Sequence, residues 1–464
     1  MFFSSAPVAD TLPVIKLYIE DKQILELEDQ VKKRLRLKDS VNANKDIEFR
    51  YVAAKLTDHL GIDHEISIRL RGDMKANYSN GLHNATYRFN VSGGKLFGKD
   101  KLSFIRPELE NYGFYGFLFY KFFEQEGFIS NDFHFIRLYF NDEDIGIYIL
   151  QEGFSDELIT SSGRKDGLIL RFKYDGLGYY NSVPELVPYH QKRIMREPAM
   201  LALLDNARNK FLAAADGKIA PSECFNTQLF GKYYALSDLF LSHHSLMTHN
   251  LKLWLNPYNG LFEPIAWDPA NFVRYDINMD LIYKGHNYTF DSIYDFKAKF
   301  PVHYLLSGDS TFLYYYTKYL YDYSGNDSIS SFINRNISYI SEIEPEIFRE
   351  DFQPGFEPEW ILSRVNQTML MFKATELVTA SFYINDSLLI IRSASNLPVL
   401  VKSVVFGSQS FKIGRIVLPG KSVQITISPD TNNISSGKFD LVTTYLYPDV
   451  EHVYEGLIFV NSGK

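Results

Sequence analysis

The sequence has one cysteine, Cys224, among its 464 residues, and none of its apolar runs approaches 18 residues. A single cysteine excludes an intrachain disulfide framework and any zinc site with several cysteine ligands. The densest apolar stretch, residues 114–123 (FYGFLFYKFF), is too short to span a bilayer, so no membrane span is expected. The N-terminal residues lack the basic and apolar regions of a signal peptide, so none is expected in this chain.

The sequence also lacks an excess of positive charge, because 48 lysines and arginines stand against 56 aspartates and glutamates, for a net charge of −8. A general nucleic-acid-binding protein needs a basic face that neutralises phosphates, so no nucleic-acid partner is expected. Walker-type loops, GxGxxG and GxSxG are absent. Aromatic residues are abundant, with 37 phenylalanines and 32 tyrosines, and they predict a large aromatic core.

The hydrophobic patterning predicts an α+β fold. Alternating apolar and polar residues predict strands and one clear hairpin at 12–19, 48–56, 64–71, 85–91 and 133–152. Residues 167–173 read as a further strand and residues 174–191 as a loop. Helical spacing predicts helices over 20–39, 108–126, 192–218, 227–242 and most of 290–375. We therefore expect a sheet-rich part at 1–152, a mostly helical part at 153–376, and a β-sandwich at 377–464.

The polar segment His243–Asn250 is the best candidate for chemistry, and Asp268 follows it 18 residues later in the sequence IAWDP. An amide oxygen from Asn250 and a carboxylate from Asp268, joined by a short hairpin, match the ligands that kinases use for magnesium. Two alternatives stay open. Asn250 and Asp268 could simply cap a turn and a helix. His243, His249 and Asp268 could instead hold a transition metal, as in a metal-dependent hydrolase.

Charged residues elsewhere suggest a second part of the site. Arg69 and Arg71 lie on one side of an alternating strand just before a glycine-containing loop, where two guanidinium groups could bind a polyphosphate. The alternative is a solvated edge strand. Glu152 ends a nearly apolar strand, and its carboxylate either caps the backbone or contacts a ligand.

Five segments in order resemble the CotH family, kinase-like proteins named after a spore coat protein. The segments read LPVIKLYIEDKQILEL, ISIRLRGDMKANYS, ATYRFNV, FHFIRLYFNDEDIGIYILQEGF and THNLKLWLNPYNGLFEPIAWDPANF, and the resemblance covers residues 12–376. It implies an atypical protein-kinase-like domain with a sheet-rich N-lobe over 1–152 and a helical C-lobe over 153–376. It also implies ATP with Mg²⁺ or Mn²⁺, and phosphoryl transfer to Ser or Thr of a surface or coat protein.

The resemblance also implies roles for particular residues. Asn250 and Asp268 match the metal ligands, and Glu152 matches the glutamate at the end of the hairpin. Arg71 lies in the phosphate-side segment, and Arg88 in the strand that carries the nucleotide lysine. The family association suggests the cell surface or secretion, although this chain shows no leader.

The chain departs from the family pattern at several catalytic positions. No lysine precedes Tyr87, so Arg88 or Lys75 would have to supply that cation. Ser245 stands where the catalytic aspartate is expected, and Asp238 is too distant along the chain. The second aspartate of the Trp-Asp segment is replaced by Ala270, with Asn271 beside it.

Besides the metal-dependent hydrolase, two functions therefore remain open at the level of the sequence. His244 or His249 could replace the base, since a histidine titrates near neutral pH, and the chain would then be an enzyme. Otherwise it is a pseudokinase that serves as a structural or assembly module of an envelope, coat or particle.

Overall fold

The computed structural model describes residues 12–36, 49–72, 75–110, 113–173, 185–269, 301–347, 356–430 and 437–460. The chain forms two compact units. The first comprises Met1–Leu212, Met247–Asn271 and Ser331–Glu357, and the second comprises Ala213–Leu246, Phe272–Ser330 and Pro358–Lys464. The α+β prediction is confirmed, because helices and three sheets occur along the chain.

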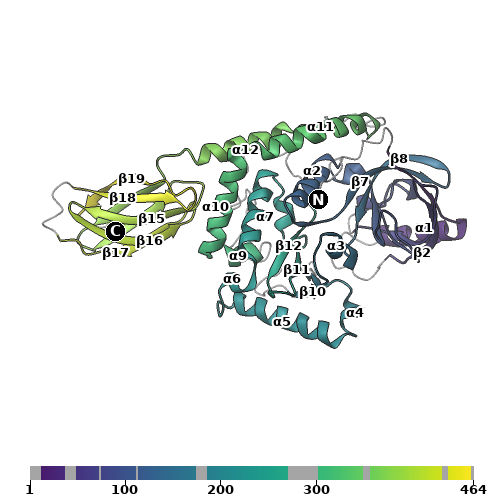
Figure 1. The fold of residues 1–464 in the computed structure, drawn as a ribbon, viewed down its shortest axis with the longest axis horizontal. Helices are drawn as coiled ribbons and strands as arrows, with labels where there is room; N and C mark the ends of the chain where they lie inside the picture. The colour runs from purple at the N-terminus through teal and green to yellow at the C-terminus, as the bar shows by residue number, and fades with distance from the viewer. Residues whose placement is uncertain are drawn as a thin grey trace. The chain divides into compact units, whose positions relative to one another are not determined.

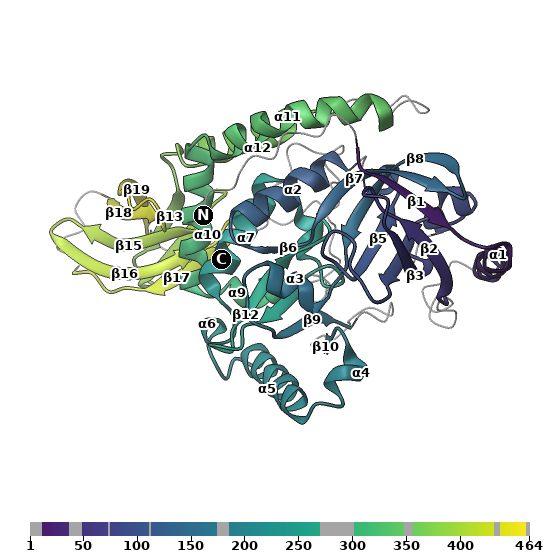
Figure 2. The same ribbon diagram turned by 45° about the vertical axis from the view of Figure 1, so that its right-hand side comes forward.

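A closed barrel of seven strands, in the order β1-β2-β3-β4-β5-β8-β7, lies in the first unit (Figure 2). Its strands are β1 (Val14–Tyr18), β2 (Val52–Thr57), β3 (Asp63–Leu70), β4 (Tyr87–Val91), β5 (Lys101–Ile105), β7 (Phe133–Phe140) and β8 (Glu143–Glu152). Parallel pairing of β1 with β7 closes it, and alternate residues fill its interior. The sequence predicted all of these strands except β5.

The hairpin between β7 and β8 is confirmed and has a physical reason. Asn141 and Asp142 both have positive φ, 48° and 66°, which is the backbone that a two-residue hairpin turn requires. Aspartate and asparagine tolerate this backbone better than most residues do. The turn thereby fixes the register that brings Glu152 to the end of β8.

A second sheet of the first unit has the order β10-β9-β11-β12-β6. Its strands are β6 (Ile129–Ser130), β9 (Leu168–Phe172), β10 (Leu186–Pro188), β11 (Lys252–Leu255) and β12 (Phe262–Ala266). The loop prediction for 174–191 was wrong at β10, which pairs with β9 through backbone hydrogen bonds that its short sequence does not reveal. Residues 174–184 lie outside the described residues.

Helix α2 (Phe114–Gln125) begins six residues later than the sequence predicted. Gly113, which precedes it, has φ +79°, and an added Cβ would lie 2.8 Å from Cδ1 of Ile149. Gly127 closes the segment with φ +84°, as expected for a glycine after a helix. Eleven of the described helices are α-helices: α1 (Asp21–Leu35), α2, α3 (Asp156–Ser161), α4 (Gln191–Ile194), α5 (Pro198–Ala215), α6 (Pro221–Cys224), α7 (Thr227–Leu239), α9 (Pro301–Leu306), α10 (Ser310–Gly325), α11 (Ser328–Ile347) and α12 (Glu359–Met371).

The C-terminal strands form one continuous sheet in the order β16-β15-β18-β19-β13-β14-β17 (Figure 1). They are β13 (Val378–Tyr383), β14 (Leu388–Ser393), β15 (Val399–Phe406), β16 (Gln409–Val417), β17 (Ser422–Thr426), β18 (Lys438–Tyr445) and β19 (His452–Phe459). The sequence predicted strands here in two stacked sheets, whereas hydrogen bonds join all seven. The buried rings of Phe382, Phe406 and Phe439 contact one another at its core.

The predictions on membrane spans and on residues 270, 271 and 290–300 can be compared with the structure only where it describes the chain. None of the described helices is long and apolar enough to cross a bilayer. Ala270, Asn271 and residues 290–300 lie outside the described residues, so the expectations placed on them are not addressed. The domain boundaries at 152 and 376 stay predictions.

Candidate functional site

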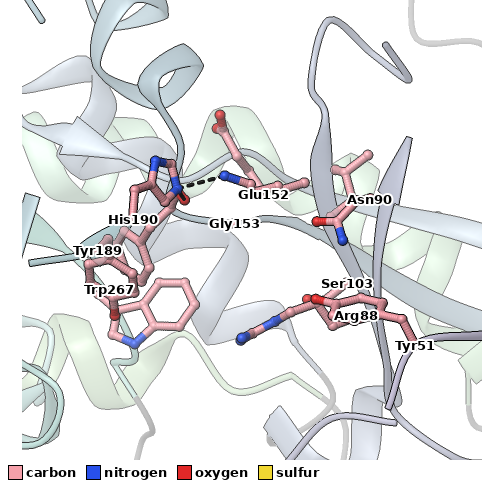
Figure 3. A pocket seen from close by; sticks show the side chains of 12 residues that line it. Tyr51, Arg88, Asn90, Ser103, Glu152, Gly153, Tyr189, His190 and Trp267 are labelled. Carbon is pink, nitrogen blue, oxygen red and sulfur yellow. Dashed lines mark hydrogen bonds between the residues drawn. The ribbon is translucent and has the colours of Figure 1, made fainter. Parts of the chain in front are cut away.

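A pocket of about 190 Å³ lies in the first unit, where barrel strands β4, β5 and β8 meet a segment from the second sheet (Figure 3). The barrel contributes Arg88, Asn90 and Lys101, together with Glu152 at the end of β8. The other wall contains rings, from Phe154, Tyr189, His190 and Trp267. The pocket therefore combines cations and aromatic rings, and Glu152 is the one carboxylate among its described lining residues.

Strand alternation explains why β4 presents polar groups to the pocket. Tyr87 and Phe89 are fully buried in the barrel core, so the residues between and after them, Arg88 and Asn90, face outward. In an antiparallel pair, directly opposed residues share a face. Asn90 stands opposite Lys101 of β5, and both line the pocket.

Three arginines gather at this face of the barrel. Arg88 is directly opposite Arg69 in the register of β3 and β4, a placement in which like charges repel. Burial, and then the charges of Arg71 and Arg69, lower the pKa of Arg88 to about 10. Among the described residues, neither Arg69 nor Arg88 has an acidic partner. Because charged groups in proteins are ordinarily paired when desolvated, this cluster is suited to an anion.

Aromatic rings hold two guanidinium groups beside the pocket, that of Arg71 and that of a fourth arginine, Arg171. The guanidinium of Arg71 lies 5.8 Å from the ring centroid of Trp267, and that of Arg171 lies 5.7 Å from Tyr189. Such contacts orient the guanidinium without neutralising its charge. The structure thus brings the predicted residues Arg71 and Arg88 together, with Arg171 as an additional cation.

Lys101 is a cation that the sequence did not single out. Its ammonium donates a hydrogen bond to Nε2 of His190 over 2.6 Å (Figure 3, dashed line). His190 has a left-handed backbone, with φ 57°, where the chain enters α4. An ammonium has three donors, so Lys101 keeps capacity for other acceptors while His190 holds it.

Glu152 forms a buried ion pair whose lysine also lies outside the predicted set. Its carboxylate lies 2.9 Å from the ammonium of Lys99, which in turn lies 3.1 Å from Asp132. Burial raises the pKa of Glu152 to about 7, and the Lys99 ammonium opposes this rise. Removing one member of such a pair leaves the other charge buried without compensation. Glu152 therefore anchors Lys99 at the edge of the pocket, and contact with a cofactor stays a prediction.

The predicted metal ligands lie at the same end of the β11–β12 hairpin. Lys252 pairs with Ile265, so the chain positions just before β11 and just after β12, Asn250 and Asp268, stand at neighbouring strand ends. Asp268 has φ 48°, a strained backbone that persists where the surroundings hold it. Its backbone N–H donates to the hydroxyl of Tyr120 over 3.0 Å.

A hydrogen-bonded chain connects Asp268 to the arginine cluster. The same Tyr120 hydroxyl accepts from Nε2 of Gln151 over 3.0 Å, and Oε1 of Gln151 accepts from Arg71 over 3.1 Å. Two residues, Tyr120 and Gln151, thus join a candidate metal ligand to a candidate phosphate ligand within one unit. Networks of this kind fix the relative position of the groups they join.

Lys252 is a buried cation beside the candidate metal ligands. Its ammonium donates to the backbone oxygens of His249 and Asn250 over 2.7 and 2.9 Å. Burial lowers the pKa of Lys252 to about 7, while the carboxylate of Asp268 acts in the opposite direction. The lysine therefore fixes the backbone of the loop that carries Asn250.

The remaining predicted residues occupy the loop between α7 and β11. Ser245 is buried, and its hydroxyl donates to the backbone oxygen of Ser242 over 2.7 Å. His244 is half-buried, and His249 is exposed. His244 and Ser245 belong to the second unit and His249 to the first, because the chain passes between the units after Leu246.

His243 and Asp238 form a separate buried group in the second unit. His243 hydrogen-bonds to Asp238, whose carboxylate also accepts from the hydroxyl of Tyr316 over 2.5 Å. The histidine and the nearby Arg364 hold the pKa of Asp238 below its usual range despite burial. Among the described residues, no three His, Cys, Asp or Glu side chains gather as a metal site would require.

Comparison with known protein families gives one match. A family model described as CotH kinase protein matches residues 68–307, just over half of the chain. The chain belongs to the CotH kinase protein family. The matched region of this CotH kinase domain contains all eight residues predicted for the site. A search of curated proteins finds no match for this chain.

Sequence reasoning missed Lys99, Lys101, His190 and Lys252 in this CotH kinase domain. Lys101 reaches the pocket through the pairing of β4 with β5, and β5 was not predicted. Strand β5 (KLSFI) has five residues, and its alternation of apolar and polar residues is too short to separate a strand from a loop. Lys252 could have been found as the single charge in an otherwise apolar strand, LKLWL.

Proposed function

We propose that the chain binds ATP in the pocket of the first unit and transfers its terminal phosphoryl group to a Ser or Thr hydroxyl of a surface or coat protein. One observation carries the proposal: Arg88 in the pocket, and Arg69 and Arg171 beside it, have no acidic partner among the described residues. A triphosphate supplies several negative charges, and planar guanidinium groups bind phosphate oxygens in pairs.

Asn250 and Asp268 are the residues that would hold Mg²⁺ or Mn²⁺. Their amide and carboxylate oxygens are the hard donors that these ions prefer, so the donor set fits. Bound there, a divalent ion would neutralise charge that develops on the phosphates. The chain of hydrogen bonds from Asp268 through Tyr120 and Gln151 to Arg71 supports a common site for metal and phosphate.

The chemistry requires a proton acceptor near the attacking hydroxyl. The hydroxyl oxygen would bond to the terminal phosphorus as the bond to the bridging oxygen breaks and ADP leaves. His249 or His244 would accept the hydroxyl proton, because a histidine near neutral pH suits this role. Loss of such a base typically lowers the rate by about 10²–10⁴-fold.

Transfer of labelled terminal phosphate to a casein-like acceptor or to the chain itself tests this proposal. We expect Mg²⁺- or Mn²⁺-dependent labelling that D268N and N250A abolish, while D29N, a change on exposed helix α1, leaves it intact. The double variant H244Q/H249Q should lose transfer and keep ATP binding. Unchanged transfer in that variant would remove the histidines from the mechanism.

A second candidate function, a pseudokinase that assembles an envelope, coat or particle, has its own support. No carboxylate occurs between Phe240 and Asn250, and Asp238 is buried against His243 and Tyr316. ATP at 100 times its dissociation constant would add about 2.7 kcal/mol of stability in either case. Stabilisation without transfer to any acceptor would favour the pseudokinase.

A further inference from the structure

We propose that the pocket recognises the phosphate chain of its ligand and discriminates little between bases, so that inorganic tripolyphosphate competes with ATP for it. The inference rests on the proposed function, since it concerns the same pocket. It specifies the class of ligand: linear triphosphates, with or without a nucleoside.

The charge of the pocket supports recognition of a polyanion. Arg88 and Lys101 project into it from adjacent strands, and neither forms an ion pair with a carboxylate among the described residues, although the charge of Asp100 acts on Lys101. Arg193 of the same unit, by contrast, contacts three carboxylates, those of Asp156, Asp166 and Glu197. The cations of the pocket thus differ from a fully paired cation such as Arg193.

The rings of the pocket are already in contact with other groups. The ring of Phe154 lies 4.5 Å from that of Tyr189 and 4.6 Å from that of Trp267. Arg171 packs on Tyr189, and Arg71 on Trp267. A base that stacked on either ring would compete with these partners. We infer that the rings position guanidinium groups for phosphates.

The size of the pocket agrees with recognition of the phosphate chain and not of the base. Its volume of about 190 Å³ is below the roughly 300–1,000 Å³ of pockets that enclose a whole drug-sized ligand. A phosphate chain is compact, and a nucleoside attached to it would extend beyond the described walls. Figure 3 shows the Arg88 guanidinium extending toward Trp267 across the pocket, with His190 on the same wall as Trp267.

Displacement of a fluorescent ATP analogue from the full-length chain, with Mg²⁺ present, tests the inference. We expect ATP, GTP and tripolyphosphate to displace it at concentrations within about fivefold of one another, and adenosine to have no effect. In K101M, the affinities for ATP and tripolyphosphate should fall by the same factor, about tenfold, as expected for one charge-assisted hydrogen bond. K412M removes an exposed lysine of β16 and should change neither.

The outcomes separate the inference from the proposed function. If ATP binds and a 100-fold excess of tripolyphosphate leaves it bound, or if GTP is rejected, the base is recognised and the inference is overturned, while nucleotide binding stands. If tripolyphosphate binds and ATP does not, the pocket excludes the nucleoside, and both the inference and the kinase proposal are wrong. If neither binds, both are wrong. A K101M variant that weakens ATP alone would also overturn the inference.

Discussion

Arg88 shows at the scale of one residue how function can oppose stability. Its guanidinium is half-buried, stands opposite Arg69 and lacks an acidic partner among the described residues. A sequence selected only for folding would place an apolar or paired side chain at such a position. Binding sites retain such unfavourable groups because a ligand supplies the missing partner.

Replacement of Arg88 by methionine should therefore have opposite effects on stability and binding. We expect R88M to raise the free energy of unfolding of the ligand-free chain by up to about 1 kcal/mol, because a cross-strand repulsion is removed. The same change should weaken ATP binding by about tenfold or more, since a charge-assisted hydrogen bond is lost. Denaturant unfolding and a binding titration measure the two quantities.

The matched control for this variant is R415M, which removes an exposed arginine from β16 of the second unit. It should change neither quantity. A loss of stability in R88M, together with unchanged ATP affinity, would mean that Arg88 has a structural partner and that the pocket is not an anion site.

Strand pairing decides, at the scale of elements, which of these residues could be predicted. Arg69 and Arg71 were accessible to sequence analysis, because alternation within one strand places them on one side. Lys101 was not, because its position depends on the register between β4 and β5, which no local pattern specifies. His190 adjoins β10, a strand of three residues that carries too little periodicity to be recognised.

Helices α7 and α10 approach closely at Gly231. An added Cβ at this position would lie 2.7 Å from Cβ of Tyr315 and 2.8 Å from the backbone nitrogen of Tyr316. We expect G231A to lower the free energy of unfolding by about 1–3 kcal/mol, even though alanine is the better helix former, because backbone cannot yield as a side chain can. In G308A, where an added Cβ meets nothing within 4 Å, thermal unfolding should be unchanged.

The contact between α9 and α7 makes the second unit sensitive to acid. His303 stacks on Tyr234 with ring centroids 5.6 Å apart, and burial lowers its pKa from 6.5 to about 3. Below pH 6.5 the unfolded chain therefore binds a proton at His303 that the folded chain does not bind. The free energy of unfolding is greatest above that pH and falls as the pH decreases below it. The loss at pH 5 should be about 2 kcal/mol.

Replacement by phenylalanine tests this explanation, because it keeps a ring and removes the titration. The difference in free energy of unfolding between pH 7 and pH 5 should be about 2 kcal/mol smaller in H303F than in the original chain. The comparison uses each variant as its own reference, so a constant change in stability does not affect it. An equal difference in both proteins would show that His303 is not responsible.

At the scale of the whole molecule, order along the chain carried more information than any single motif. Five segments of modest specificity, in the right succession, predicted the family that the family comparison then established. The α+β class followed from alternating patterns and helical spacing in separate segments along the chain. Sheet closure could not be predicted in the same way, because the joining of β1 to β7, or of β13 to β19, pairs strands that are far apart in sequence.

The division into two units predicts which strands a bound ligand should protect from amide hydrogen exchange. The pocket belongs to the first unit, whereas the C-terminal sheet has its own aromatic core and packs on α12, where the hydroxyl of Tyr445 donates to the backbone oxygen of Met371 over 2.6 Å. With ATP and Mg²⁺ at 100 times the dissociation constant, amide hydrogen exchange should slow by up to about 100-fold in β4, β5 and β8. Exchange in β15 and β18 should stay the same, and R88M should lose the protection. Slowing confined to β15 and β18 would place the ligand in the other unit and refute the assignment of the site, because protection by mass action is greatest in the element that binds.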